Sequence, residues 1–314
     1  MSNLIKTNST SISTTGSRII TQHQYEPYSQ RLSRENKGCF VFMIDQSGSM
    51  AESWGVDDSK TKADMVAYYV NEALHEIINI CQKTEADPRH YFDICVMGYG
   101  QDTLQANILW EGSLAGKTFV SPADLKQNPT GISGEIEIEK VVWGKATKQK
   151  IPLSFWFSPI AESMTPMGAA FDLCEATLKK WCAENPISFP PVVINITDGM
   201  QSDCENKDLL IKAQKVKETG TAYGTSLLFN FHLSEDAGSP LIFPSSENEL
   251  PDDEYCHLLF NMSSELPEVF RKRIAIEIKN EDYSASKNYI GLTYQANVAA
   301  LVKSMNIGTR TLNV

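Results

Sequence analysis

The chain lacks the long apolar runs and paired cysteines that would place it in several large classes of protein. None of its apolar runs approaches the roughly 18 residues of a membrane-spanning helix, and its first residues hold no apolar core of signal-peptide length. Its seven cysteines are scattered without a C-x-x-C pair, which argues against a disulfide framework or a zinc site. These absences predict a cytoplasmic protein with reduced thiols and no membrane partner.

An excess of basic residues is missing as well. The 314 residues include 28 Lys and Arg against 39 Asp and Glu, which gives a net charge of -11. Sequence-independent binding to nucleic acid depends on a basic surface that neutralises phosphates, so the balance predicts no nucleic-acid partner. Histidine is also scarce, and the five histidines are dispersed along the sequence, which offers no obvious catalytic or metal-binding cluster of imidazoles.

Composition shifts along the chain predict its organisation. Residues 1–18 are rich in Ser, Thr and Asn and poor in apolar groups, and together with the polar residues that follow they predict a flexible or extended segment over 1–37. A main domain is expected over 38–310. Short alternating stretches punctuated by Gly and Pro predict a β-hairpin-rich insertion at about 101–160 that interrupts this domain.

Apolar strands and amphipathic helices alternate outside the insertion. Strands are predicted at 39–44, 91–99, 192–197, 225–233 and near 255–261, and helices at 65–81, 165–181, 205–218, 265–278 and 294–306. Thr165 and Pro166 are interpreted as the N-cap and first residue of one helix. The pattern predicts an α/β fold, doubly wound, with a mainly parallel central sheet flanked by helices and a β-rich insertion.

Two of the apolar strands end in an acid, and both acids are expected at the same edge of the sheet. The sequence there reads Asp45-Gln46-Ser47-Gly48-Ser49 and Thr197-Asp198-Gly199, and ligands bind at this edge in open α/β sheets. Gly48 is expected to allow a backbone conformation that other residues resist. Carboxylates and hydroxyls are hard oxygen donors that favour Mg²⁺, with Mn²⁺ or Ca²⁺ also suitable. The predicted metal ligands are Asp45, Ser47, Ser49, Thr165 and Asp198.

This pattern resembles the metal-ion-dependent adhesion site (MIDAS) of von Willebrand factor A (vWA) domains. That site reads D-x-S-x-S, then a distant Thr, then a distant Asp within T-D-G, which Asp45, Ser47, Ser49, Thr165 and Asp198 match. The resemblance covers roughly residues 38–100 and 160–306, and Met164 stands where the family commonly has Gly. It implies a doubly wound fold and a metal whose open position is filled by an Asp or Glu of a partner protein.

The resemblance implies a protein-interaction module that is not an enzyme. Its C-terminal region, 291–310, looks like that of a bacterial, tellurite-resistance-linked (TerY-like) group, whose cytosolic relatives are often encoded beside phosphatases, kinases or AAA+ ATPases. A stress-response or defence role follows by that analogy. Two alternatives stay open: a metal-dependent hydrolase or phosphotransfer enzyme with Asp45 as nucleophile, and a domain whose site is purely structural.

Two charged segments allow further hypotheses. An acidic loop at 247–254 is most simply a solvated loop, but one of its acids could instead occupy the metal's open position in an idle state. The insertion carries local positive charge that suits either a solubilising hairpin or an acidic partner, at Lys140, Lys145, Lys148 and Lys150.

Overall fold

The computed structural model describes residues 25–54, 59–82, 85–102, 104–142, 145–234, 239–278 and 283–312. Residues 1–24 of the predicted N-terminal segment lie outside this part of the chain. Within it, no helix combines the length and the apolar character needed to cross a membrane. The side chains of residues 136–149 are likewise outside the description, which leaves the charge hypothesis for the insertion untested.

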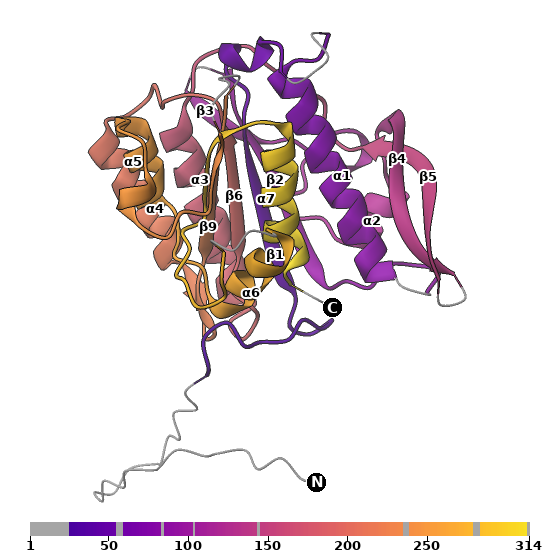
Figure 1. Cartoon of the computed structure of the whole chain (residues 1–314). Helices are drawn as coiled ribbons and strands as arrows, with labels where there is room; N and C mark the ends of the chain where they lie inside the picture. The colour runs from indigo at the N-terminus through magenta and orange to yellow at the C-terminus, as the bar shows by residue number, and fades with distance from the viewer. Residues whose placement is uncertain are drawn as a thin grey trace, which may run out of the picture.

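A seven-stranded sheet forms the centre of the fold (Figure 1). Five neighbouring strands are parallel, in the order β11 (Leu292–Ala296), β9 (Leu227–Leu233), β6 (Val192–Thr197), β1 (Gly38–Asp45) and β2 (Phe92–Asp102). Antiparallel strands β10 (Leu241–Ile242) and β3 (Gln105–Ile108) complete the two edges. The chain runs outward from β1 to β2 and later, on the other side, from β6 to β9, so the direction of winding reverses between β1 and β6.

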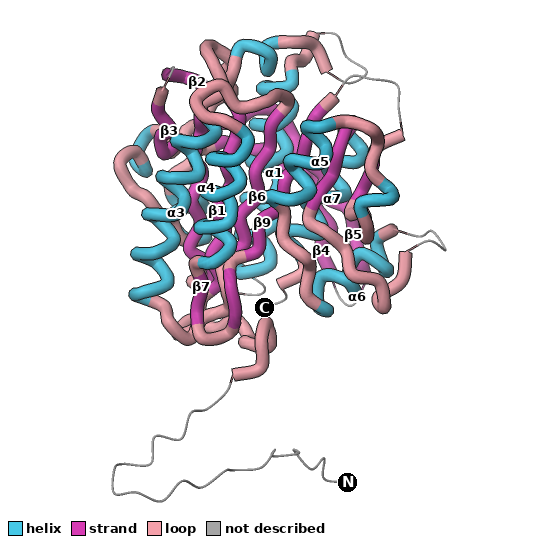
Figure 2. Tube along the Cα trace, turned by 90° about the vertical axis from the view of Figure 1, so that its left-hand side faces the viewer, coloured by secondary structure: helices cyan, strands magenta, loops and turns pink. Residues whose placement is uncertain are grey.

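Helices cover both faces of this sheet, as Figures 1 and 2 show. All eight residues of β1 are buried, because successive side chains point to opposite faces and both faces are covered. Phe40, Phe42 and Ile44 belong to the core beneath α1 (Lys62–Gln82), α6 (Glu268–Glu277) and α7 (Val298–Arg310). Cys39, Val41 and Met43 belong to the core beneath α3 (Met167–Glu184), α4 (Asn206–Glu218) and α5 (Glu254–Met262). The predicted α/β, doubly wound class is therefore confirmed.

A separate hairpin projects beside α1 (Figure 1). It consists of β4 (Gly131–Val142) and β5 (Lys145–Phe155), which pair antiparallel in a two-stranded sheet of their own. Two side chains of α1 hold its base: His75 Nε2 accepts from the backbone N–H of Ser154 at 2.8 Å, and Asn71 Oδ1 accepts from that of Trp156 at 3.1 Å. The Trp156 indole is buried and donates to the Leu125 carbonyl at 2.8 Å, which ties the hairpin to α2 (Pro122–Gln127).

The remaining elements are short: the 3₁₀ turns η1 (Gly48–Ala51), η2 (Gly112–Leu114) and η3 (Glu247–Glu249), and the small hairpin of β7 (Gly220–Thr221) and β8 (Gly224–Thr225).

Three predicted elements differ from the structure. The segment near 255–261 is the helix α5 and not a strand, because Asp253 caps its first turn by accepting from the backbone N–H groups of Tyr255 and Cys256. The predicted helix at 294–306 is preceded by the unpredicted strand β11 and begins only at Val298. Within the predicted hairpin-rich insertion, the alternating stretch at 117–120 contributes only a single bridge, between Ile94 and Val120.

Candidate metal centre

Asp45 lies at the end of β1, where the winding of the sheet reverses. Its carboxylate is completely buried. Oδ1 accepts from the backbone N–H of Ser47 at 2.9 Å, and Oδ2 accepts from the Thr197 hydroxyl at 2.7 Å. Burial raises the pKa of Asp45 to about 6, although these hydrogen bonds act in the opposite direction. Within the described part of the chain no basic side chain forms an ion pair with Asp45, so its negative charge has only neutral partners.

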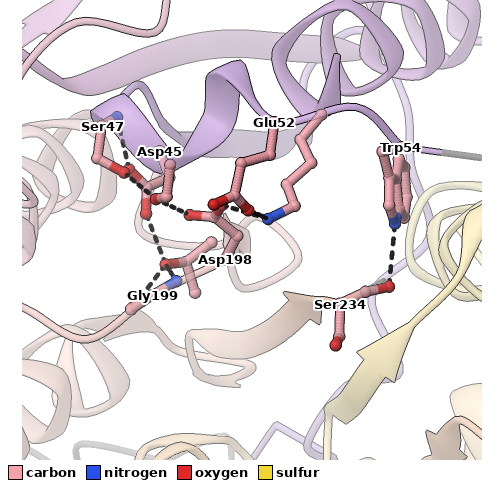
Figure 3. Close-up of polar contacts among 10 residues, drawn as sticks. Asp45, Ser47, Glu52, Trp54, Asp198, Gly199 and Ser234 are labelled. Atoms are coloured by element: carbon pink, nitrogen blue, oxygen red, sulfur yellow. Dashed lines mark hydrogen bonds and ion pairs between the residues drawn. The ribbon is translucent and has the colours of Figure 1, made fainter. Parts of the chain in front are cut away.

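A chain of short polar contacts runs from this loop to the end of β6 (Figure 3). The hydroxyl oxygens of Ser47 and Ser49 are 3.1 Å apart, and the Ser49 hydroxyl donates to Asp198 Oδ1 at 2.7 Å. The side chain of Asp198 is fully shielded from solvent. Two loops separated by about 150 residues of sequence thus place two carboxylates and two serine hydroxyls at one edge of the sheet, as parallel strands predict.

Two glycines at the end of β2 set the position of the Asp45–Ser49 loop. A Cβ atom on Gly98 would lie 2.1 Å from Gln46 Oε1, and one on Gly100 would lie 2.6 Å from the Gln46 carbonyl carbon. Gly100 also has a φ of +120°, which side chains disfavour. The special backbone conformation predicted for Gly48 is not found, because its φ is not positive. Gly48 instead begins the 3₁₀ turn η1, and its N–H donates to the Ser163 carbonyl at 2.9 Å.

Thr165 lies on a third loop that is bonded to both of the others. Its N–H donates to the Ser202 hydroxyl at 2.9 Å, and its carbonyl accepts from the Ser202 N–H at 2.9 Å. The neighbouring Ser163 pairs with Ser47 in a parallel bridge. Thr165 is buried, but these contacts are made by its backbone. The structure therefore places Thr165 at the same edge. Side-chain hydrogen bonds join Ser47, Ser49 and Asp198, and Asp45 is attached to this group through the Ser47 backbone N–H and to the end of β6 through the Thr197 hydroxyl.

The start of α3 corrects the predicted capping. The N-cap position is occupied by Pro166 and not by Thr165, and the helix begins at Met167. The first turn is instead satisfied by Asp203, whose carboxylate accepts from the N–H groups of Gly168 at 3.0 Å and Ala169 at 2.8 Å. The positive end of the helix dipole favours this arrangement. Sequence patterns could not identify Asp203, because it follows β6 and reaches α3 only through the fold.

Lys62, which the sequence analysis did not predict, also contacts the candidate centre. Its ammonium lies 3.0 Å from Asp198 Oδ2 and 2.6 Å from Glu52 Oε2. Burial would lower the pKa of Lys62, but the hydrogen bonds and negative charges of Glu52 and Asp198 outweigh this effect and raise it. One signal was present: Lys62 opens α1, and the positive end of a helix is where a cation is least favourable. A lysine there needs carboxylate partners.

The acidic loop contacts other parts of the molecule. Besides capping α5, Asp253 accepts from the Tyr294 hydroxyl at 2.7 Å. Glu249 accepts from the Ser245 hydroxyl at 2.5 Å. Among the described residues, Glu52 contacts the candidate centre through its ion pair with Lys62. The idle-state hypothesis for residues 247–254 stays a prediction.

The donor set fits a hard divalent cation. Among the described residues no three His, Cys, Asp or Glu side chains form a group that could hold a metal ion, so a centre here would rest on two carboxylates complemented by hydroxyls. Such oxygen donors suit Mg²⁺, which usually keeps several waters. The buried Asp45 carboxylate, which has no cationic partner in the described chain, is the observation that favours a bound cation, because a buried charge is costly unless it is paired.

No family model matches the chain, and no curated protein matches it. Solved structures to which the chain shows similarity include the manganese-loaded Plasmodium vivax TRAP protein, with 14% identity, a TM-score of 0.39 and coverage of 91% of this chain and 77% of that one. The pilus adhesin SpaC from Lactobacillus rhamnosus GG has 13% identity, a TM-score of 0.45 and coverage of 92% and 31%. Proximal thread matrix protein 1 from the mussel byssus has 11% identity, a TM-score of 0.35 and coverage of 74% and 42%. The chain thus spans less than half of the latter two proteins, and similarities this low carry no argument about function.

Proposed function

We propose that the chain is a protein-interaction module of von Willebrand factor A type with a MIDAS, and that it binds a partner without catalysing a reaction. A divalent cation, Mg²⁺ in first place and Mn²⁺ or Ca²⁺ as alternatives, would be held by Asp45, Ser47, Ser49, Thr165 and Asp198. When bound, the cation supplies a positive charge that an Asp or Glu carboxylate of the partner protein can neutralise. The observation that carries the proposal is the meeting of four of these side chains where the sheet reverses its winding.

The chain's own residues prepare this edge for a cation. Asp45 contributes a buried negative charge whose two oxygens are oriented by the Ser47 N–H and the Thr197 hydroxyl. Ser49 holds Asp198 in a fixed position beside the serine loop. Because the glycines of β2 press against Gln46, the loop has little freedom to move away. Such preorganisation reduces the free energy that ordering the ligands would otherwise cost.

The same geometry disfavours the alternative in which Asp45 is a nucleophile. A nucleophilic carboxylate must reach the substrate, whereas Asp45 is completely buried and both of its oxygens accept hydrogen bonds from the protein. The residue two positions later is Ser47 and not a second acid. We expect no turnover of generic phosphate esters in the presence of Mg²⁺. Reproducible activity that disappears in Asp45→Asn would establish the enzymatic alternative.

The proposal extends to the cellular setting by analogy with the resembled group. The partner would be a cytoplasmic bacterial protein such as a phosphatase, kinase or AAA+ ATPase encoded nearby, and the complex would serve stress response or defence. Neither nucleic acid nor a membrane is proposed as a partner, in keeping with the net charge of -11.

Calorimetric titration with Mg²⁺ and Mn²⁺ tests the metal centre directly. Wild type should bind one ion, and Asp45→Ala should bind none while keeping its secondary structure. The matched control is Asp172→Ala, which removes an exposed acid that pairs with Lys212 on the surface and should bind metal normally. Equal metal uptake by wild type and Asp45→Ala would refute the assignment. Partner capture from the native host, with and without EDTA, would then test whether binding follows the metal.

A further inference from the structure

We propose that Lys62 is a second positive charge of the binding centre that selects for an acidic partner, and that Glu52 is its resident counter-ion, which the partner's carboxylate displaces. The inference rests on the proposed function and adds a specificity residue and a built-in competitor to the same site.

The Lys62–Asp198 pair is a permanent part of the site. The side chain of Lys62 is only 7% exposed and that of Asp198 is fully buried. The position of Lys62 is also fixed by its backbone, because its N–H donates to the Glu52 carbonyl at 2.9 Å and the adjacent Ser53 and Thr61 form an antiparallel bridge. A buried ion pair of this kind is costly to break. The ammonium therefore stays at the centre whatever else binds there.

Glu52 is attached to the same ammonium in a different way. Its side chain is 62% exposed, although Oε2 lies 2.6 Å from Lys62 Nζ. Exposed ion pairs contribute little to stability, and salt screens them. Glu52 can therefore leave Lys62 at small cost to the folded state. Since one nitrogen holds both a buried and an exposed carboxylate, the exposed one occupies a position that another carboxylate could take.

Counting charges shows why an exchange of carboxylates suits this site. Asp45 and Asp198 carry two negative charges, which a divalent cation would balance, and Lys62 then leaves one positive charge that Glu52 neutralises. A partner carboxylate that replaces Glu52 restores neutrality, whereas a neutral group leaves an unbalanced charge in a partly dehydrated site. Without Lys62, the metal-loaded centre with Glu52 would carry a net negative charge and repel the acid it is meant to bind.

A purely structural role for Lys62 makes different predictions. If Lys62 served only to neutralise Asp198 for folding, its removal would weaken metal and carboxylate binding together or leave both unchanged. A role as second cation predicts opposite changes, because the ammonium repels the metal and attracts the carboxylate.

The test uses the full chain with Mn²⁺ alone as the metal probe and acetate as the carboxylate probe. Metal binding is followed by calorimetry, and acetate binding to the Mn²⁺-loaded protein by its effect on water proton relaxation. Lys62→Met should bind Mn²⁺ about tenfold more tightly or better, and acetate about tenfold more weakly or worse. Glu52→Gln, which removes only an exposed charge and should fold normally, should bind acetate about threefold to tenfold more tightly and Mn²⁺ no more tightly than wild type.

Lys60→Met is the matched control, because it makes the same substitution two residues earlier on an exposed side chain and should change neither affinity appreciably. If wild type binds Mn²⁺ and acetate but Lys62→Met and Glu52→Gln bind both as wild type does, the roles of Lys62 and Glu52 are refuted while the proposed function stands. Parallel losses of both affinities in Lys62→Met, without a gain for acetate in Glu52→Gln, would also overturn the inference. Absence of any Mn²⁺ or Mg²⁺ uptake by wild type would overturn the inference and the proposed function together.

Discussion

Replacing Asp45 by Asn should make the metal-free protein more stable while abolishing its response to metal. Burial raises the pKa of Asp45 from 3.8 to about 6, which means that the folded state holds the ionised carboxylate less favourably than the unfolded chain does. At 1.36 kcal/mol per pH unit, the shift corresponds to about 3 kcal/mol of destabilisation at neutral pH. Asparagine removes the charge and can still accept from the Ser47 N–H, so most of this free energy should be recovered in EDTA.

Urea denaturation at pH 7.5 measures the effect. In EDTA, Asp45→Asn should raise the free energy of unfolding by up to about 3 kcal/mol. With metal at about 100 times its Kd, wild type should gain about 2.7 kcal/mol, which nearly closes the gap, and the variant should gain nothing. Asp172→Asn, an exposed acid, is the control and should follow wild type in both media.

The pH dependence gives a second signature of the same charge. Because the pKa of Asp45 is raised in the folded state, the folded protein takes up the proton before the unfolded chain does as pH falls. Protonation of Asp45 therefore increases the free energy of unfolding as pH is lowered from 7 to about 4. The difference between Asp45→Asn and wild type in EDTA should therefore shrink over that range. A variant that is no more stable than wild type in EDTA, or that gains as much from metal as wild type does, would refute the reasoning.

Three further predictions concern polar groups elsewhere in the fold. Burial lowers the pKa of His75 to about 4, so the unfolded chain is protonated first as pH falls. The free energy of unfolding should therefore drop by about 3 kcal/mol between pH 6.5 and pH 4. His75→Gln should lack this loss in denaturant titrations, and the same pH dependence in wild type and His75→Gln would contradict the expectation. Inside the sheet, Asn195 accepts from the Tyr99 hydroxyl at 2.8 Å and donates to Asn230 Oδ1 at 3.0 Å. Asn195→Ala should lower the free energy of unfolding in urea by about 2–4 kcal/mol, because both groups lose this hydrogen bond. Asp253→Ala should cost about 1–2 kcal/mol by thermal or chemical denaturation through loss of the α5 cap, and its acetate affinity in the Mn²⁺-loaded state should equal that of wild type; a higher affinity would revive the acidic loop as an occupant of the site.

The strands and the sheet edge were predictable because apolar runs and their terminal acids are local features of the sequence. The run 39–44 is apolar throughout, as expected for a strand that is covered on both faces. Asp45, the next residue, lies at the predicted edge of the sheet. The run at 255–260 shows the limit of the same signal. Six mostly apolar residues suit a buried strand or a helix equally well, and the choice is made by Asp253, whose carboxylate caps the helix.

The rest of the candidate site depends on contacts between distant segments. Lys62 and Asp198 are 136 residues apart, and the helical periodicity of α1 identifies only which face is apolar. Asp203 caps a helix that begins 36 residues earlier in the chain, so no local motif marks it. Gly98 and Gly100 could have been noticed, because glycine within a strand often marks a close approach of another backbone.

The attachment of the β4–β5 hairpin to α1 determines where this projection can be shortened. Asn71 and His75 are both buried, and they accept hydrogen bonds from the backbone of residues 154 and 156. A truncation that replaces the outer part of the hairpin by a tight turn leaves these two donors in place. A truncation that extends past residue 154 leaves a buried acceptor, His75 Nε2 or Asn71 Oδ1, without its donor. Each acceptor left without a hydrogen bond costs about 1–3 kcal/mol of stability. The outer strands are thus a replaceable module, whereas their last residues on the β5 side belong to the body of the protein.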